Sequence, residues 1–279
     1  ARAHDASILW GRDSQQVEGM ARDRVNARFL PDYAFPSGLQ PLASLEQAVR
    51  QADEVLIAVP SHAFGSVLES IRPYLQSGQG VAWACKGLEP GSGEFLHVMA
   101  QRILPDQHPL AVLTGPSFAT EVAADLPTAV TVAGTEPAFC TRVAQAFHGG
   151  NFRAYTSDDI VGAELGGAVK NVLAVATGIS DGMGLGNNAR AALVTRGLAE
   201  MMRMGHAIGA QDRTLMGLAG MGDLVLTCTG DLSRNRRLGL ALGRGDTIEQ
   251  AVSEIGQVVE GVQTSGEVWR LARRLDVEM

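Results

Sequence analysis

The sequence has few cysteines and no long apolar run, and each shortage excludes a class of protein. The three cysteines, Cys85, Cys140 and Cys228, are isolated and lack the spacing of a metal site or a disulfide framework. This pattern is typical of a reducing cytosol, so we expect a cytoplasmic protein without a metal, with the thiols as small buried side chains. No run of 18 apolar residues and no signal-peptide pattern occur, so we expect no integral membrane segment.

An excess of positive charge is also absent. The 279 residues carry 23 basic and 30 acidic side chains, a net charge of −7, which argues against nucleic acid or an anionic membrane as the main partner. Local basic clusters can still bind a small anion. With 46% hydrophobic and 19% charged residues, the composition is that of a globular protein with one large or two smaller domains.

The first 156 residues alternate short apolar, β-branched stretches with helical patterns. We predict strands at residues 7–10, 54–59, 80–86, 110–115, 128–133 and 152–155, and helices at 44–52 and 63–75. Strands that are apolar on both faces and separated by amphipathic helices indicate a mostly parallel α/β sheet. Ligands bind beyond the carboxyl ends of such strands, so these ends are the places to search for a site.

From residue 157 to residue 279 the strand signal almost vanishes. Helical periodicity predicts helices at residues 159–177, 189–208, 222–227, 233–242, 247–255 and 262–275. Thr247 and Gln250 have the spacing of a capping box. We therefore expect an α/β domain over residues 1–156 and an all-α domain over residues 157–279.

The glycine fingerprint of a dinucleotide-binding sheet, G-x-G-x-x-G, follows none of the predicted strands. Residues 182–186 are rich in glycine but lie between two helices. Either the sheet is of another type, or the first strand and its phosphate loop precede Ala1. The chain starts without a methionine and residues 1–5 resemble the end of a helix, which favours the second explanation.

Lys170 lies in an otherwise small and apolar helical pattern, with no carboxylate at helical spacing. Burial among apolar neighbours lowers the pKa of a lysine, which suits a general acid/base. A lysine that extends to solvent is the alternative. Asp223, after a glycine-rich turn, is either a helix N-cap or the group that orients a catalytic lysine or a substrate hydroxyl.

Ser233, Arg234 and Asn235 open a predicted helix. An N-cap serine, free backbone N–H groups and a guanidinium together attract phosphate, although a solvated basic helix start has the same pattern. On the sheet side, Lys86 follows a strand and is a candidate for an anionic group. Arg12 can meet a 2′-phosphate and Asp13 a ribose hydroxyl, so the sequence leaves NADP and NAD open. His62, at another strand end, is a weak catalytic candidate.

With these residues identified, the chain resembles the bacterial NAD(P)-dependent glycerol-3-phosphate dehydrogenases. The resemblance rests on segments that follow the family's order over nearly the whole chain: residues 59–62, 86–89, 115–121, 166–171, 188–190, 196–200, 220–224, 233–237 and 257–261. It implies a Rossmann-type domain and a helical domain with the active site between them. It also implies reversible hydride transfer between sn-glycerol 3-phosphate and dihydroxyacetone phosphate, a reaction that feeds glycerophospholipid synthesis. The expected partner is thus a small phosphorylated substrate. The oligomeric state stays open, and a homodimer is one possibility.

The resemblance also assigns residues. Lys170 matches the family's proton acceptor, and we expect Asp223, with Lys86, to hold and polarise the reacting end as a second catalytic residue. The positions that match substrate contacts are Lys86, Gly115, Ser117, Lys170, Asp223, Ser233, Arg234 and Asn235, and those that match cofactor contacts are Arg12, Lys86, Ala119, Arg234, Val258 and Glu260. The family's phosphate loop and its C-terminal extension are absent, so we expect both ends of the protein to lie outside this sequence. A β-hydroxyacid dehydrogenase of the same architecture and a non-catalytic dinucleotide-binding protein are the alternatives.

Overall fold

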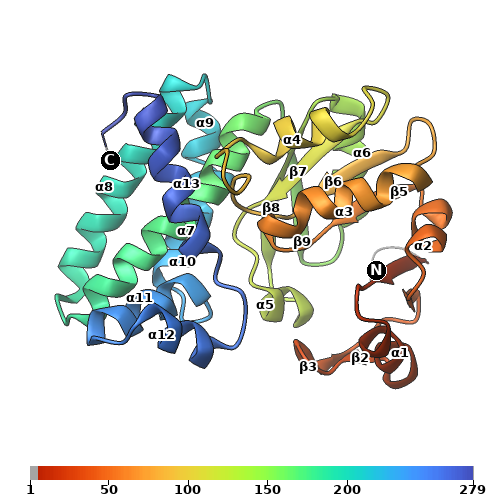
Figure 1. Ribbon diagram of the computed structural model, residues 1–279, viewed down its shortest axis with the longest axis horizontal. Helices are drawn as coiled ribbons and strands as arrows, with labels where there is room; N and C mark the ends of the chain where they lie inside the picture. Colours follow the sequence, from red (N-terminus) through yellow and green to blue (C-terminus); the bar gives the residue numbers. More distant parts are fainter. Residues whose placement is uncertain (1–5, 279) are drawn as a thin grey trace.

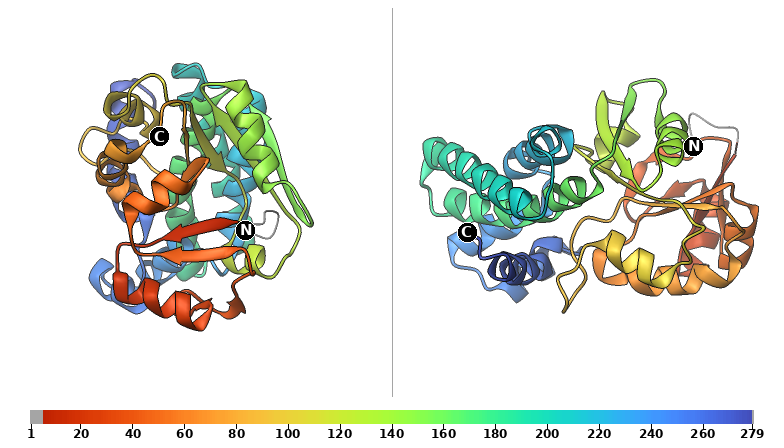
Figure 2. Two further views of the ribbon diagram at one scale, coloured as in Figure 1. Left: turned by 90° about the vertical axis from the view of Figure 1, so that its right-hand side faces the viewer. Right: turned by 90° about the horizontal axis from the view of Figure 1, so that it is seen from above.

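The computed structural model describes residues 6–278 and shows two lobes of different secondary structure (Figure 1). Every strand of the described part precedes residue 158, and the chain beyond it is helical. This confirms the predicted fold class, an α/β sheet followed by a helical region. The helix end predicted at residues 1–5 lies outside the described residues. Seen from above, the helical lobe and the sheet lobe lie side by side (Figure 2, right).

The main sheet has five strands in the order β5-β6-β7-β8-β9. All neighbours are parallel except β7 and β8, which run antiparallel. The predicted strands are confirmed to within a few residues, with bounds β5 Glu54–Ile57, β6 Gly80–Trp83, β7 Leu110–Thr114, β8 Thr128–Gly134 and β9 Phe152–Ser157. Because β5, β6 and β7 are parallel, the segments that follow them emerge at one edge of the sheet, which faces the helical lobe.

Helices cover both faces of this sheet. Side chains alternate between the faces along each strand, so Trp83 packs with Phe64 and Leu96 while its neighbour Ala82 faces Phe139 on the opposite side. The helices on the first side are α3 (Phe64–Ile71) and α4 (Leu96–Ile103), with α2 (Leu45–Gln51) nearby, and α6 (Pro137–Phe147) covers the second. The three cysteines are free and buried, as predicted.

A smaller strand pair precedes the main sheet. β1 (Ser7–Trp10) pairs in parallel with β4 (Leu39–Leu42), as the left view of Figure 2 shows. Between them lie α1 (Ser14–Asp23) and a hairpin of β2 (Val25–Asn26) and β3 (Leu30–Ala34). β1 was predicted from the sequence, whereas the other three strands were not, because they are short and prolines interrupt β3 and β4.

The helical lobe is built around α7 (Ile160–Gly182). It is surrounded by α8 (Gly186–Ala207), α10 (Asp223–Thr229), α11 (Arg234–Arg244) and α13 (Glu260–Arg274), with α9 (Asp212–Leu215) and α12 (Ile248–Ile255) at the periphery. The predicted helices and the capping box at Thr247 are confirmed. The sequence analysis missed α9 and the π-helical turn η3 (Leu218–Gly222).

α7 is long and apolar enough to cross a membrane by length and composition, with a mean hydropathy of 1.3. However, 72% of that window is buried inside the protein, and its leucine and valine side chains belong to the core with Met201 and Leu224. These features are those of a core helix.

Candidate active site

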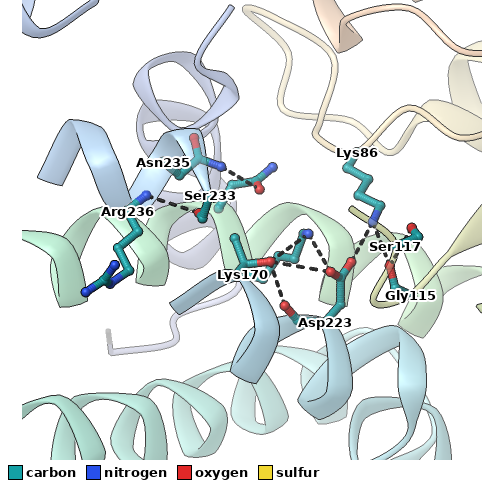
Figure 3. A network of polar contacts seen from close by, with 10 residues as sticks. Lys86, Gly115, Ser117, Lys170, Asp223, Ser233, Asn235 and Arg236 are labelled. Carbon is teal, nitrogen blue, oxygen red and sulfur yellow. Dashed lines mark hydrogen bonds and ion pairs between the residues drawn. The ribbon is translucent and has the colours of Figure 1, made fainter. Parts of the chain in front are cut away.

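The chain contains two lysines, Lys86 and Lys170, and both donate to one carboxylate. Lys170 Nζ lies 2.7 Å from Oδ1 of Asp223, and Lys86 Nζ lies 2.6 Å from Oδ2 of the same residue. Lys86 comes from the sheet lobe, whereas Lys170 and Asp223 come from the helical lobe. Asp223 therefore joins the two lobes at the edge where the predicted site residues converge (Figure 3).

Lys170 is buried in the middle of α7, with 6% of its surface exposed. Its ammonium also donates to Oγ1 of Thr227 at 2.9 Å, so two of its three N–H positions are occupied. Burial lowers the pKa of Lys170 to about 8, although the carboxylate of Asp223 opposes this shift. The lysine thus does not extend to solvent, and its pKa has moved toward the range in which a base works at neutral pH.

Asp223 is the first residue of α10 and is 1% exposed. Its side chain does not cap the helix, so the N-cap interpretation is wrong for this residue. Burial raises the pKa of Asp223, but the charges of Lys170 and Lys86 outweigh it, and the pKa lies below its ordinary value. The π-turn η3 places this carboxylate against the lysines, and a sequence pattern cannot reveal that geometry.

Lys86 lies in the loop after β6, since the strand ends at Trp83 rather than at residue 86 as predicted. Its ammonium donates to the carbonyl of Gly115 at 3.0 Å, and the hydroxyl of Ser117 donates to the same carbonyl at 3.0 Å. Gly115 has a φ of +140°, and a Cβ there would lie 3.0 Å from Cα of Val130, so a glycine is required. The loops after β6 and β7 are thereby held together at the site.

The helix start predicted to bind phosphate is formed as expected. Ser233 caps α11 by accepting a hydrogen bond from the backbone N–H of Arg236 at 3.2 Å. The guanidinium of Arg234 is exposed and has no hydrogen-bond partner among residues 6–278. Asn235 differs from the expectation, because its side chain is buried and joins three elements: it donates to Asn171 at 2.8 Å and accepts from the N–H of Gly261 at 2.9 Å.

Two residues near Lys170 were not singled out from the sequence. Asn171 is 4% exposed, and within the described part of the chain its Nδ2 is a buried donor without a partner. Thr227 accepts from Lys170 and donates to the carbonyl of Asp223 at 2.6 Å. Asn171 adjoins the lysine in sequence, which is a usable signal, whereas Thr227 lies one helical turn after Asp223 and only the folded helix brings it to Lys170.

Three of the residues matched to a dinucleotide, Arg234, Val258 and Glu260, lie at one cleft. A groove of about 480 Å³ runs between the lobes and is lined by Pro60, Arg234 and Val258, with the hairpin residues Arg28 and Phe29 on its other side. The carboxylate of Glu260 accepts from Oγ of Ser61 at 2.7 Å and so crosses this cleft. Hydrogen-bonding, apolar and cationic groups lie together here, as a nicotinamide dinucleotide requires.

The remaining predicted residues lie in the sheet lobe, outside the residues that line the groove. Arg12 is exposed beyond β1, where the adenosine end of a dinucleotide binds in such sheets. One carboxylate oxygen of Asp13 caps α1 by accepting from the N–H of Gln16 at 3.1 Å. Ala119 begins the short helix α5 (Ala119–Ala123), and His62 is exposed in a turn after β5.

Comparisons with known proteins agree with this geometry. The family models described as NAD-dependent glycerol-3-phosphate dehydrogenase N-terminus and C-terminus match residues 1–140 and 159–279. The glycerol-3-phosphate dehydrogenase [NAD(P)+] of Stenotrophomonas maltophilia is 60% identical over 279 residues, which are 100% of this chain and 82% of that protein. The chain belongs to this family. It is an NAD(P)-dependent oxidoreductase of glycerol 3-phosphate, and the comparisons support this interpretation rather than the β-hydroxyacid or non-catalytic alternatives.

Solved structures extend the match to three dimensions. The glycerol-3-phosphate dehydrogenase from Coxiella burnetii superposes with a TM-score of 0.94 at 46% identity, covering 98% of this chain and 84% of that one. The enzyme from Saccharomyces cerevisiae reaches 0.82 at 25% identity, covering 96% and 81%. The Rossmann-type sheet and the helical lobe of this chain are therefore those of the family.

Proposed function

We propose that Lys170 is the acid/base of the reversible conversion of sn-glycerol 3-phosphate to dihydroxyacetone phosphate in this chain. Oxidation removes a proton from the C2 hydroxyl and a hydride from C2, and the oxidised dinucleotide, when bound, would supply the hydride acceptor. Neutral Lys170 takes the hydroxyl proton, and in the reverse direction its ammonium returns a proton to the ketone oxygen. The observation that carries this assignment is the buried Nζ of Lys170, whose pKa burial lowers to about 8.

Asp223 and Lys86 hold the reacting end of the substrate in this proposal. The carboxylate of Asp223 keeps Lys170 and Lys86 on either side of it, at 2.7 and 2.6 Å. Lys86 then presents a positive charge from the sheet lobe, which polarises the substrate oxygen as charge develops on it. Ser117 and the Gly115 carbonyl fix the position of Lys86 rather than contribute a charge.

The start of α11 holds the substrate phosphate. Arg234 is free to form a two-pronged contact with phosphate oxygens, and the helix N-terminus capped by Ser233 offers backbone N–H groups. Asn235 acts through its bonds to Asn171 and Gly261, which tie this helix start to α7 and α13. Phosphate binding energy then positions C2 against Lys170.

The dinucleotide lies in the cleft between the lobes. Val258 and Arg234 line this cleft, and Glu260 reaches across it to Ser61, so these residues would hold the dinucleotide, with Lys86 beside Asp223 at the reacting end. Arg12 meets the adenosine end, where its charge favours a 2′-phosphate, and Ala119 begins the helix that flanks the cleft. We place the domain boundary between residues 156 and 157, and we place the protein in the cytoplasm as a soluble enzyme able to form a homodimer.

The test of the acid/base assignment is Lys170→Ala, with NADH oxidation followed in the presence of dihydroxyacetone phosphate. We expect kcat to fall by about 10²–10⁴-fold, the usual contribution of general acid–base catalysis. The Kd for NADH, measured by fluorescence titration, should stay unchanged, which shows that the variant is folded. A near-normal kcat would overturn the assignment.

A further inference from the structure

Arg236 is a buried arginine that the reaction does not use. It is 7% exposed and lies on the first turn of α11, two residues after the phosphate-binding Arg234. Its guanidinium forms an ion pair with Asp181 at 2.9 Å and a second with Asp231 at 2.7 Å. In Figure 3 its side chain extends away from Lys170 and Asp223, so it does not contribute directly to the catalytic group.

The partner Asp181 lies near the end of α7, the helix that carries Lys170. Its side chain is 5% exposed and also accepts from Nε of Arg190 on α8, at 2.8 and 3.0 Å. One buried carboxylate therefore holds α8 and α11 against α7. Because charge-assisted hydrogen bonds of a planar guanidinium are directional, Arg236 can satisfy Asp181 in few orientations of α11.

Glycines bring the backbones of α7 and α11 into contact along the same interface. A Cβ on Gly178 would lie 2.2 Å from the carbonyl oxygen of Arg236, and a Cβ on Gly239 would lie 2.1 Å from that of Val175. One turn further on, Gly182 and Gly243 face each other in the same way, with a Cβ on Gly182 placed 2.9 Å from Cα of Gly243. We call these four residues the glycine seam. Such contact leaves α11 little freedom to slide or rotate on α7.

We propose that Arg236 is a positioning residue for substrate phosphate. Together with Asp181 and the glycine seam, it sets the distance and direction from the start of α11 to Lys170. This inference rests on the proposed phosphate contact of Arg234. A rotation of α11 would carry Arg234 and the capped N-terminus away from the phosphate while leaving Lys170, Asp223 and Lys86 in place. Arg236 should therefore govern affinity for the phosphorylated substrate rather than the chemical step.

The test compares Arg236→Met with Arg237→Met. Arg237 is the adjacent residue, carries the same charge and is exposed, so it is a matched control. For Arg236→Met we expect KM for dihydroxyacetone phosphate and Ki for inorganic phosphate as a competitor to rise about tenfold or more, since small displacements of a binding group have effects of this size. KM for NADH should rise much less than KM for dihydroxyacetone phosphate, because Arg234 is one of several groups that line the cofactor groove. Arg237→Met should resemble the unmodified protein.

Arg236→Lys keeps the positive charge but loses the planar fork, so it should recover only part of the affinity. If Arg236→Met does not fold, KM and Ki of Arg236→Lys are compared with those of Arg237→Met instead. A merely structural role would lower Tm and the active fraction without changing KM or Ki, and that result would overturn the proposal.

The phosphate contact itself is tested separately by Arg234→Ala. If that substitution leaves KM and the Ki for phosphate unchanged, the proposed phosphate site is wrong. If Arg234→Ala raises both constants while the Arg236 variants do not, only the positioning inference fails.

Discussion

Lys170 Nζ lies 2.7 Å from Oδ1 of Asp223, a residue that follows it by 53 positions in the chain. The ammonium and the carboxylate are both buried, so Asp223 compensates the charge of Lys170, and Lys86 shares the same carboxylate. Burial nevertheless dominates the pKa of Lys170 and lowers it to about 8. The pair thus holds a lysine in place while leaving its proton easy to remove, and this combination can be measured directly.

The presence of two lysines makes the pKa of Lys170 accessible to NMR. Selective ¹³Cε labelling of lysine should yield one resonance each for Lys86 and Lys170, assigned by Lys86→Met. We expect the Lys170 resonance to titrate at about pH 8, because burial disfavours its charged form. A midpoint near the ordinary value of 10.5 would contradict the role of burial.

The two reaction directions should respond oppositely to pH. Oxidation of glycerol 3-phosphate needs neutral Lys170, so its kcat/KM should rise with pH through a midpoint near 8. Reduction of dihydroxyacetone phosphate needs the ammonium, so its kcat/KM should fall through the same midpoint. Each direction is a control for the other, since loss of folded protein at high pH would lower both. Parallel profiles would exclude Lys170 as the titrating group.

Asp223→Asn should destabilise the protein. The substitution leaves two lysine charges without their shared carboxylate, a defect that typically costs about 3–5 kcal/mol for a buried pair. Asp223 raises the pKa of Lys170, so its loss should lower that pKa further. The loss of Tm should therefore be largest at pH values below the lowered pKa of Lys170 in the variant. It should be smaller above about pH 8, where Lys170 loses its charge in both proteins. Glu46→Gln, which removes an exposed ion pair with Arg50, is a control that should have little effect.

Arg234→Ala should raise KM for dihydroxyacetone phosphate by about tenfold or more, the loss expected for a charge-assisted hydrogen bond. Steady-state assays at saturating NADH measure this, with Arg237→Ala as the control on the same helix. The thermal stability should not change, because Arg234 is exposed. An equal rise in both variants would point to general electrostatics rather than to a phosphate contact.

Gly239→Ala should destabilise the helical lobe by roughly 1–3 kcal/mol, as overpacking does. Its Cβ would lie 2.1 Å from the carbonyl oxygen of Val175, which belongs to the backbone of α7 and cannot move aside cheaply. Gly19→Ala is the matched control, since the nearest atom to its Cβ is the far end of Arg22 at 3.8 Å. That change should stabilise α1 slightly. Equal Tm values for the two variants would show that α7 and α11 can move apart at the glycine seam without loss of stability.

The sequence predicted elements well where periodicity or capping chemistry was strong. The long helix around Lys170 and the helix capped by Ser233 follow from apolar spacing and an N-cap residue, both local properties. Strands β2 to β4 were not predicted because all three are short and prolines interrupt β3 and β4. Their pairing depends on tertiary neighbours more than on local pattern. The π-turn before Asp223 was not predicted, because its geometry has no sequence pattern of its own.

For the active site, local sequence patterns were sufficient to indicate which residues can act. It placed Lys170 in an apolar helix, Arg234 at a capped helix start and Lys86 beyond a strand, because these depend on local composition. Three contacts could be found only in the folded protein: Asp223 joins both lysines, Asn235 links three helices, and Asp181 holds Arg236. These contacts join residues far apart in the chain. Their distances are set by how the helices pack, which no local pattern specifies.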